Sequence, residues 1–228
     1  MPLTTSPTEL TTAATDAALA ILCIGLAAGL RRERSADRWK VGLWTWVLVL
    51  VACASCLGAL AHGFIMADSL QEALWKAIYP ALGVSVGLFF IGAVRDWSGQ
   101  ATAVRWLPYG IGAGLLAYAF TEVFHGDFLV FILYETAAML GALALYARLA
   151  MAGRLRGAGI IAGAILLNIA AAGVQAGTWS LRIIVPFDHN GLFHLLQMAG
   201  LALLARGLRL TLRGARTASP YGTSASIL

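Results

Sequence analysis

Seven long apolar runs are the feature of this sequence that most restricts its fold. Short polar links separate them, and each run is close to the ~20 residues that a helix needs to cross a bilayer. Closed membrane barrels show short alternating strands instead, so the sequence predicts an all-α, polytopic membrane protein with seven transmembrane helices. The predicted spans are Leu10–Leu30, Val41–Met66, Leu74–Val94, Trp106–Phe124, Phe128–Leu149, Gly157–Thr178 and Asn190–Leu210.

The same pattern predicts the domain organisation. With 60% hydrophobic and 12% charged residues, the chain has too few polar residues to form the solvated surface of a separate soluble domain. Residues 1–216 are therefore expected to form one transmembrane domain, and residues 217–228, rich in Ser, Thr, Gly and Ala, a disordered C-terminal tail. Because Asp16 lies within the first run, a six-span bundle with an interfacial first helix stays open as the alternative.

Positive charges predict the orientation. Fourteen of the sixteen Lys and Arg residues fall on one side of the predicted spans, the exceptions being Lys76 and Arg182. The positive-inside rule then places the N-terminus outside and the C-terminus in the cytoplasm of a cell (inner) membrane. The net charge of +5 is expected to bind lipid headgroups and not nucleic acid. The oligomeric state stays open, a homo-oligomer included.

Glycine pairs predict where helices approach each other closely. Gly83 and Gly87 lie four residues apart in the third run, and Gly110 and Gly114 have the same spacing in the fourth. Small residues at this spacing let backbones come together in lipid.

Ionisable side chains gather at one end of the predicted spans. Imidazoles and carboxylates are costly in or near hydrocarbon, so a group at one depth suggests a site, and these residue types bind borderline divalent metals such as zinc. The residues at this end are His62, His125, His189, His194, Asp16, Glu122, Glu135 and Asp188.

The seventh run carries the strongest polar pattern. Asn190, His194 and Gln197 form a stripe on an otherwise apolar helix, which must face the bundle. His189 points ~140° away from His194 on a continuous helix, so the two can share an ion only if His189 precedes the helix. Asp188 or Asn190 can otherwise cap the helix.

The second and fifth runs each contribute to the candidate site. Ser55, Gly58 and His62 share one face of the second run, where a partner helix or ligand can pack closely, although His62 can equally bond to a neighbouring backbone. Glu135 lies two turns inside the fifth run, where a carboxylate needs a metal, a cation or a proton.

The fourth run ends with Glu122 and His125, three residues apart. On a helix this spacing presents a carboxylate and an imidazole to one metal. Solvated interface residues are the alternative interpretation.

Seven spans with Ser55 and His62 in the second and a His-rich seventh resemble the CREST superfamily of membrane hydrolases, which includes alkaline ceramidases and progestin and adiponectin receptors. The resemblance implies a zinc site held by His62, His189 and His194, with Ser55 nearby. The family's seventh-span histidines are four apart, and here they are five apart. The stretch from Asp188 is also similar to uncharacterised bacterial seven-span proteins.

Three functions follow from these patterns. The first is a zinc hydrolase acting on a lipid amide or ester near the outer leaflet, with His125 as a further ligand and Glu135, Glu122 or Asp16 as general base. The second is a non-catalytic sensor that binds a metal or haem, the latter between His62 and His194. The third is a transporter. The lack of ionisable groups in the inner half of the spans is an argument against this function.

Overall fold

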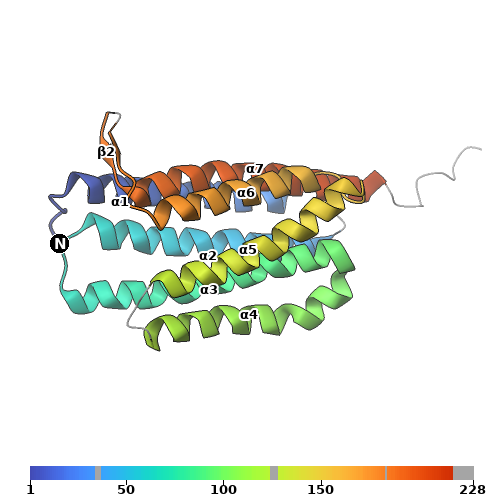
Figure 1. Cartoon of the computed structure of the whole chain (residues 1–228), viewed down its shortest axis with the longest axis horizontal. Helices are drawn as coiled ribbons and strands as arrows, with labels where there is room; N and C mark the ends of the chain where they lie inside the picture. The colour runs from blue at the N-terminus through green and yellow to red at the C-terminus, as the bar shows by residue number, and fades with distance from the viewer. Residues whose placement is uncertain (34–36, 124–127, 183, 218–228) are drawn as a thin grey trace, which may run out of the picture.

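The computed structural model describes residues 1–33, 37–123, 128–182 and 184–217, and these fold into a bundle of α-helices (Figure 1). Successive helices run in opposite directions, so both ends of the bundle are built from many segments. We call them the His62 end, where α1 begins, and the Lys40 end, where α2 begins. The helices are α1 (Pro7–Arg32), α2 (Arg38–Gly63), α3 (Asp68–Ser98), α4 (Gln100–Val123), α5 (Phe128–Met151), α6 (Ala158–Gln175) and α7 (His189–Thr217).

Six of the helices in the described part of the chain are long and apolar enough to cross a membrane, all except α4. This composition is that of a multi-pass membrane protein. The first helix is among the six despite Asp16, so the alternative of an interfacial first helix gains no support. The predicted fourth span is the one that falls short, because Arg105, Pro108 and Tyr109 interrupt its apolar residues.

Glycines bring α3 and α4 into backbone contact. A Cβ added at Gly83 would lie 2.5 Å from the carbonyl oxygen of Gly114, and one added at Gly87 would collide with the carbonyl of Gly110. Both predicted glycine pairs therefore meet each other, one from each helix. This confirms the close approach that their spacing predicts.

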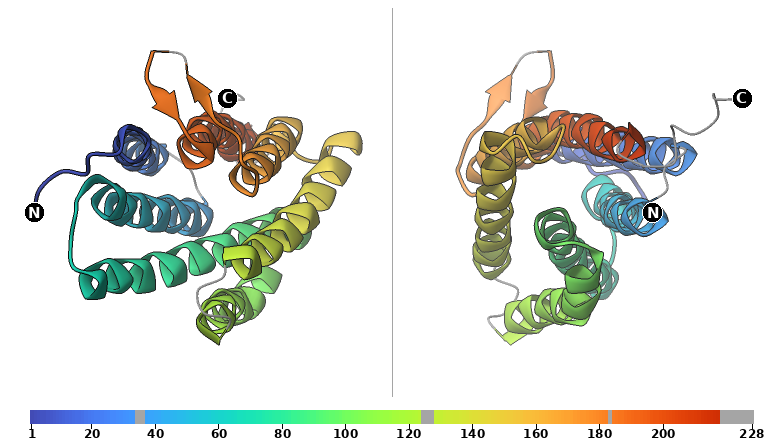
Figure 2. Two further views of the ribbon diagram at one scale, coloured as in Figure 1. Left: turned by 60° about the vertical axis from the view of Figure 1, so that its left-hand side comes forward. Right: turned by 90° about the vertical axis from the view of Figure 1, so that its right-hand side faces the viewer.

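Large apolar side chains cover much of the outer surface of the helices. Ile21, Trp46 and Leu116 expose 72%, 62% and 59% of their surface, on three different helices. Exposed apolar surface on this scale needs an apolar environment, which lipid provides. Figure 2 places α4 at the edge of the bundle, where it packs mainly on α3 and less extensively on α5.

The Lys40 end contains a buried ion pair. Lys40 Nζ lies 2.7 and 2.8 Å from the two carboxylate oxygens of Asp96 and 2.7 Å from Thr211 Oγ1. Tyr146 donates its hydroxyl to Asp96 at 3.0 Å, and Arg95 contacts the same carboxylate at 3.1 Å. The side chains of Lys40 and Asp96 are 2% and 0% exposed. The prediction that this half lacks ionisable groups is wrong, because Lys40 lies in the first turn of α2 and is buried, and does not belong to a solvated link.

A short hairpin connects α6 to α7 at the His62 end. Strands β1 (Leu181–Arg182) and β2 (Pro186–Phe187) pair antiparallel and project away from the bundle (Figure 1). Asp188 follows and caps α7, its Oδ1 accepting the Gly191 backbone N–H at 2.8 Å. The same oxygen accepts a hydrogen bond from the Thr12 hydroxyl group at 2.9 Å, and this contact fixes the start of α7 against α1.

Candidate functional site

A cavity of about 370 Å³ lies inside the bundle and is lined by every helix except α4. Its volume is in the range of small-molecule sites. Along α2 its wall runs from His62 to Val47, 15 residues and therefore about 22 Å of helix. Six of the predicted site residues line it: Asp16, Ser55, His62, Glu135, His189 and His194.

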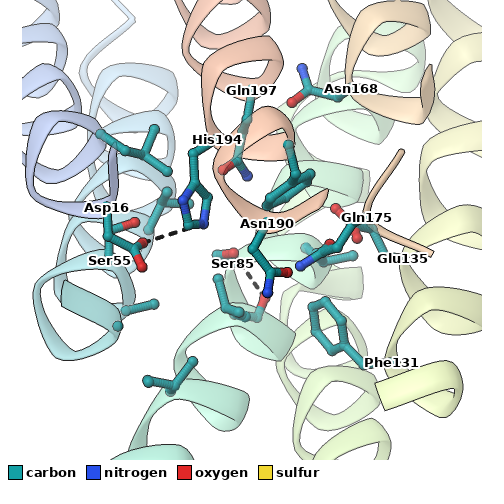
Figure 3. Close-up of a pocket in the computed structure, with 18 of the residues that line it drawn as sticks. Asp16, Ser55, Ser85, Phe131, Glu135, Asn168, Gln175, Asn190, His194 and Gln197 are labelled. Carbon is teal, nitrogen blue, oxygen red and sulfur yellow. Dashed lines mark hydrogen bonds and ion pairs between the residues drawn. The ribbon is translucent and has the colours of Figure 1, made fainter. Parts of the chain in front are cut away.

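The ring of His194 is held at both nitrogens by α1. Its Nδ1 lies 3.0 Å from Thr15 Oγ1, and its Nε2 lies 3.4 Å from Asp16 Oδ1 (Figure 3). Thr15 uses its one hydroxyl proton on the Thr12 carbonyl at 2.9 Å, so the hydroxyl accepts from His194 Nδ1–H. In the neutral ring the lone pair of Nε2 then faces the Asp16 carboxyl group.

A glycine on α2 makes room for Asp16. A Cβ at Gly58 would lie 2.6 Å from Asp16 Oδ2, so only glycine allows the carboxyl group to enter between α1 and α2. Ser55, one turn away, hydrogen-bonds to the same carboxyl group. The small-residue face predicted on α2 therefore accommodates a buried side chain of a partner helix.

His62 lies at the edge of the cavity. Its Nδ1 is 2.7 Å from Glu9 Oε2, and its ring stands edge-on to Trp75, with centroids 5.5 Å apart. The predicted alternative of a backbone partner is replaced by a carboxylate from α1. Glu9 is 41% exposed, so this ion pair faces the outside of the bundle.

Glu135 lies on the opposite wall, on α5. Phe131, one turn earlier on the same face, is only 4% exposed, and the amide groups of Gln175 and Asn190 lie close by (Figure 3). No hydrogen-bonding or charged partner from the described residues acts on the Glu135 carboxyl group. A carboxyl group at this depth without a protein partner is costly to bury.

Two of the predicted site residues are not part of this cavity in the described chain. Glu122 is exposed near the end of α4 and does not line it, because α4 contacts the outer face of α3. His125 lies outside the described residues, as do residues 218–228 of the predicted tail.

The polar lining also contains residues that were not predicted as part of the site. Ser85 and Trp75 line the cavity from α3, and Thr15 orients His194 from α1. Thr11, Thr12 and Thr15 recur at helical spacing in the sequence, and this periodicity was the available signal for a polar face on α1.

The described residues do not assemble a metal site. Among them, no group of three or more His, Cys, Asp or Glu side chains is arranged to hold an ion. His189 is the first residue of α7 and lines the same cavity as His194, five residues and about 140° away from it around the helix. Asp16 and His194 meet without a third ligand, and zinc stays a prediction.

Comparison with known proteins places the chain in a family without assigning an activity. No curated protein and no solved structure matches it. The resemblance to the CREST superfamily therefore stays a prediction. A family model described as a family of unknown function (DUF6962) matches residues 11–213, a range that includes every residue lining the cavity. Because this match covers most of the sequence, the chain belongs to the DUF6962 family.

Proposed function

We propose that this protein binds a small molecule inside a seven-helix membrane bundle, in the cavity between α1, α2, α3, α5, α6 and α7. The observation that carries the proposal is Glu135, a carboxyl group that faces the cavity without a partner in the described chain. Membrane helices keep such groups where they bind a ligand or an ion, since an unused carboxyl group costs folding energy.

The cavity wall supports ligand binding by its mixture of surfaces. Apolar side chains such as Phe89 and Leu204 line its deeper part, while Asn190, Gln175 and Gln197 supply amide groups. Pockets for small molecules combine apolar walls with a few polar groups that fix orientation.

The proposed topology places the His62 end outside and the Lys40 end in the cytoplasm. Its support is the distribution of Lys and Arg, fourteen of which lie toward the Lys40 end. As the seventh span we include α4, whose 24 residues extend about 36 Å alongside α3. The ligand then enters from the outer face of the cell membrane.

Filling the cavity tests the proposal. Ala54 is 3% exposed and lines the cavity, so Ala54→Phe is expected to occupy the ligand's volume. Thermal unfolding in detergent is measured with a panel of small cationic, neutral and anionic compounds. A compound at 100 times its Kd stabilises the native protein by about 2.7 kcal/mol. We expect one chemical class to raise the Tm of the wild type and not that of Ala54→Phe.

The matched control is Cys53→Phe, which adds the same ring on the outer side of the same helix. It should respond to the compound as the wild type does. Equal responses of the wild type and Ala54→Phe to every class would contradict binding in this cavity.

A zinc hydrolase is the second candidate, favoured by the contact of Asp16 with His194. The Thr15 hydroxyl contacts Nδ1 of this ring and fixes its orientation, as hydrogen bonds to the second ring nitrogen do for metal-bound histidines. For this candidate we expect about one equivalent of zinc by elemental analysis in the wild type and almost none in His194→Ala. Equal zinc contents in the two proteins, at any level, would exclude a zinc site at His194. An absorbance spectrum of the same samples tests the haem alternative.

A further inference from the structure

We infer that the ligand of this cavity is a small organic monocation, whose charged end lies against Glu135 and whose apolar part lies on Phe131. This inference rests on the proposed ligand-binding function and adds the chemical class of the ligand. It is argued from the charges, the aromatic surface and the volume of the cavity.

The charged groups of the cavity favour a cation. Two carboxyl groups line it, those of Asp16 and Glu135, and no Lys or Arg of the described chain does. Asp16 already has partners in Ser55 and His194. The carboxyl group that remains for a ligand is therefore that of Glu135.

The histidines do not supply the missing positive charge. His194 is held by Thr15 and Asp16, and His62 pairs with Glu9 at the edge of the cavity. His189 lies at the first position of α7, and no charge from it acts on Glu135. Among the described residues, therefore, none supplies a counter-ion for the ionised form of Glu135.

The surroundings of Glu135 suit an organic cation better than a metal ion. Phe131 lies four residues before Glu135 on α5, so its ring and the carboxyl group share one face. An aromatic ring attracts an ammonium group through its quadrupole, and amide carbonyls accept its N–H bonds. Gln175 and Asn190 offer such carbonyls on the facing wall (Figure 3). A metal ion would need more carboxylate or imidazole ligands than converge here.

The size of the cavity excludes a bare inorganic cation as the best-fitting ligand. Its volume of about 370 Å³ holds on the order of ten water molecules at ~30 Å³ each. Apolar side chains such as Val51, Phe89 and Met139 form much of the wall, so an apolar body attached to the charge gains by leaving water.

Four compounds of one branched shape, with nitrogen at the branch point in choline and carbon in the other three, separate charge from shape. Choline and 3,3-dimethylbutylamine are cations, 3,3-dimethylbutan-1-ol is neutral, and 3,3-dimethylbutanoate is an anion. Binding of each to the purified full chain in detergent is measured by calorimetry. We expect at least one cation to bind at least tenfold more tightly than both the alcohol and the anion.

Variants then locate the charge. Glu135→Gln keeps the size of the side chain and removes the ionisable group, and we expect it to weaken cation binding at least tenfold while leaving the alcohol unaffected. Phe131→Leu keeps an apolar contact without the aromatic ring and should weaken cation binding about threefold, or by roughly 0.5–1 kcal/mol. The control is Glu72→Gln, an exposed carboxyl group on α3 that does not line the cavity.

The outcomes separate this inference from the proposed function. Equal or tighter binding of the alcohol or the anion overturns the cationic ligand and keeps the cavity as a binding site. Cation binding that Glu135→Gln does not change also overturns the inference. If no class of compound binds the wild type, both the inference and the proposed function are wrong.

Discussion

Lys40→Met is expected to destabilise the protein by about 3 kcal/mol, because it removes the closer cation from the buried carboxylate of Asp96 and leaves only Arg95, at 3.1 Å, to balance its charge. The Lys40 ammonium group donates hydrogen bonds to both carboxylate oxygens of Asp96 and to the hydroxyl group of Thr211. The side chains of Lys40 and Asp96 are almost fully buried. The free energy of unfolding is measured by denaturant titration in one detergent. A loss of this size would make the Lys40–Asp96 pair the main electrostatic link between α2 and α3.

Two controls distinguish a buried charge from a lost contact. Replacing both partners, in Lys40→Met with Asp96→Leu, should recover most of the loss, because neither charge then remains in the interior. Lys76→Met removes a partner of Glu72 in an exposed ion pair and should change little. If the double variant were as unstable as Lys40→Met, the unpaired charge would not be the cause.

Gly114→Ala is expected to cost about 1–3 kcal/mol, because its methyl group cannot enter the contact between α3 and α4 without moving the backbone. A Cβ at this position would lie 2.6 Å from the Val84 backbone nitrogen and closer still to Gly83. Backbone atoms cannot rotate away as a side chain can, so the two helices must separate. Thermal unfolding in detergent measures the loss.

Gly112→Ala is the matched control on the same helix. Apart from its chain neighbours and the nearby backbone of its own helix, no atom of the described chain lies within 4 Å of its added Cβ, so the substitution should be neutral or stabilising by up to ~1 kcal/mol. Similar destabilisation by the two variants would show that α4 responds to helix propensity and not to its contact with α3.

The helices could be predicted from the sequence almost completely. The predicted fifth run, Phe128–Leu149, and α5 (Phe128–Met151) differ by two residues. The largest differences at an N-terminus are at α3 and α4, which begin six residues before the predicted Leu74 and Trp106. Polar residues such as Asp68 and Glu72 belong to a helix without being apolar, so hydropathy underestimates its length.

The sequence predicted which residues belong to the candidate site. It did not predict which of them contact each other. Depth along a helix follows from sequence position, and this placed Asp16, His62, Glu135 and His194 at one end of the bundle, where all four line one cavity. Depth does not fix the rotation of a helix or the identity of its neighbour. For this reason Glu122 has the right depth and lies outside the cavity.

By itself, the sequence determined which segments are helical, which of them are apolar enough for lipid and at which end the polar groups lie, because these properties depend on local composition and spacing. Only the tertiary structure decided the partners: Thr15 and Asp16 for His194, Glu9 for His62 and Asp96 for Lys40. Each pair joins residues distant in sequence, and their contact depends on how the helices rotate and pack. The same packing left Glu135 facing a cavity without a partner in the described chain, and the proposed ligand follows from that position.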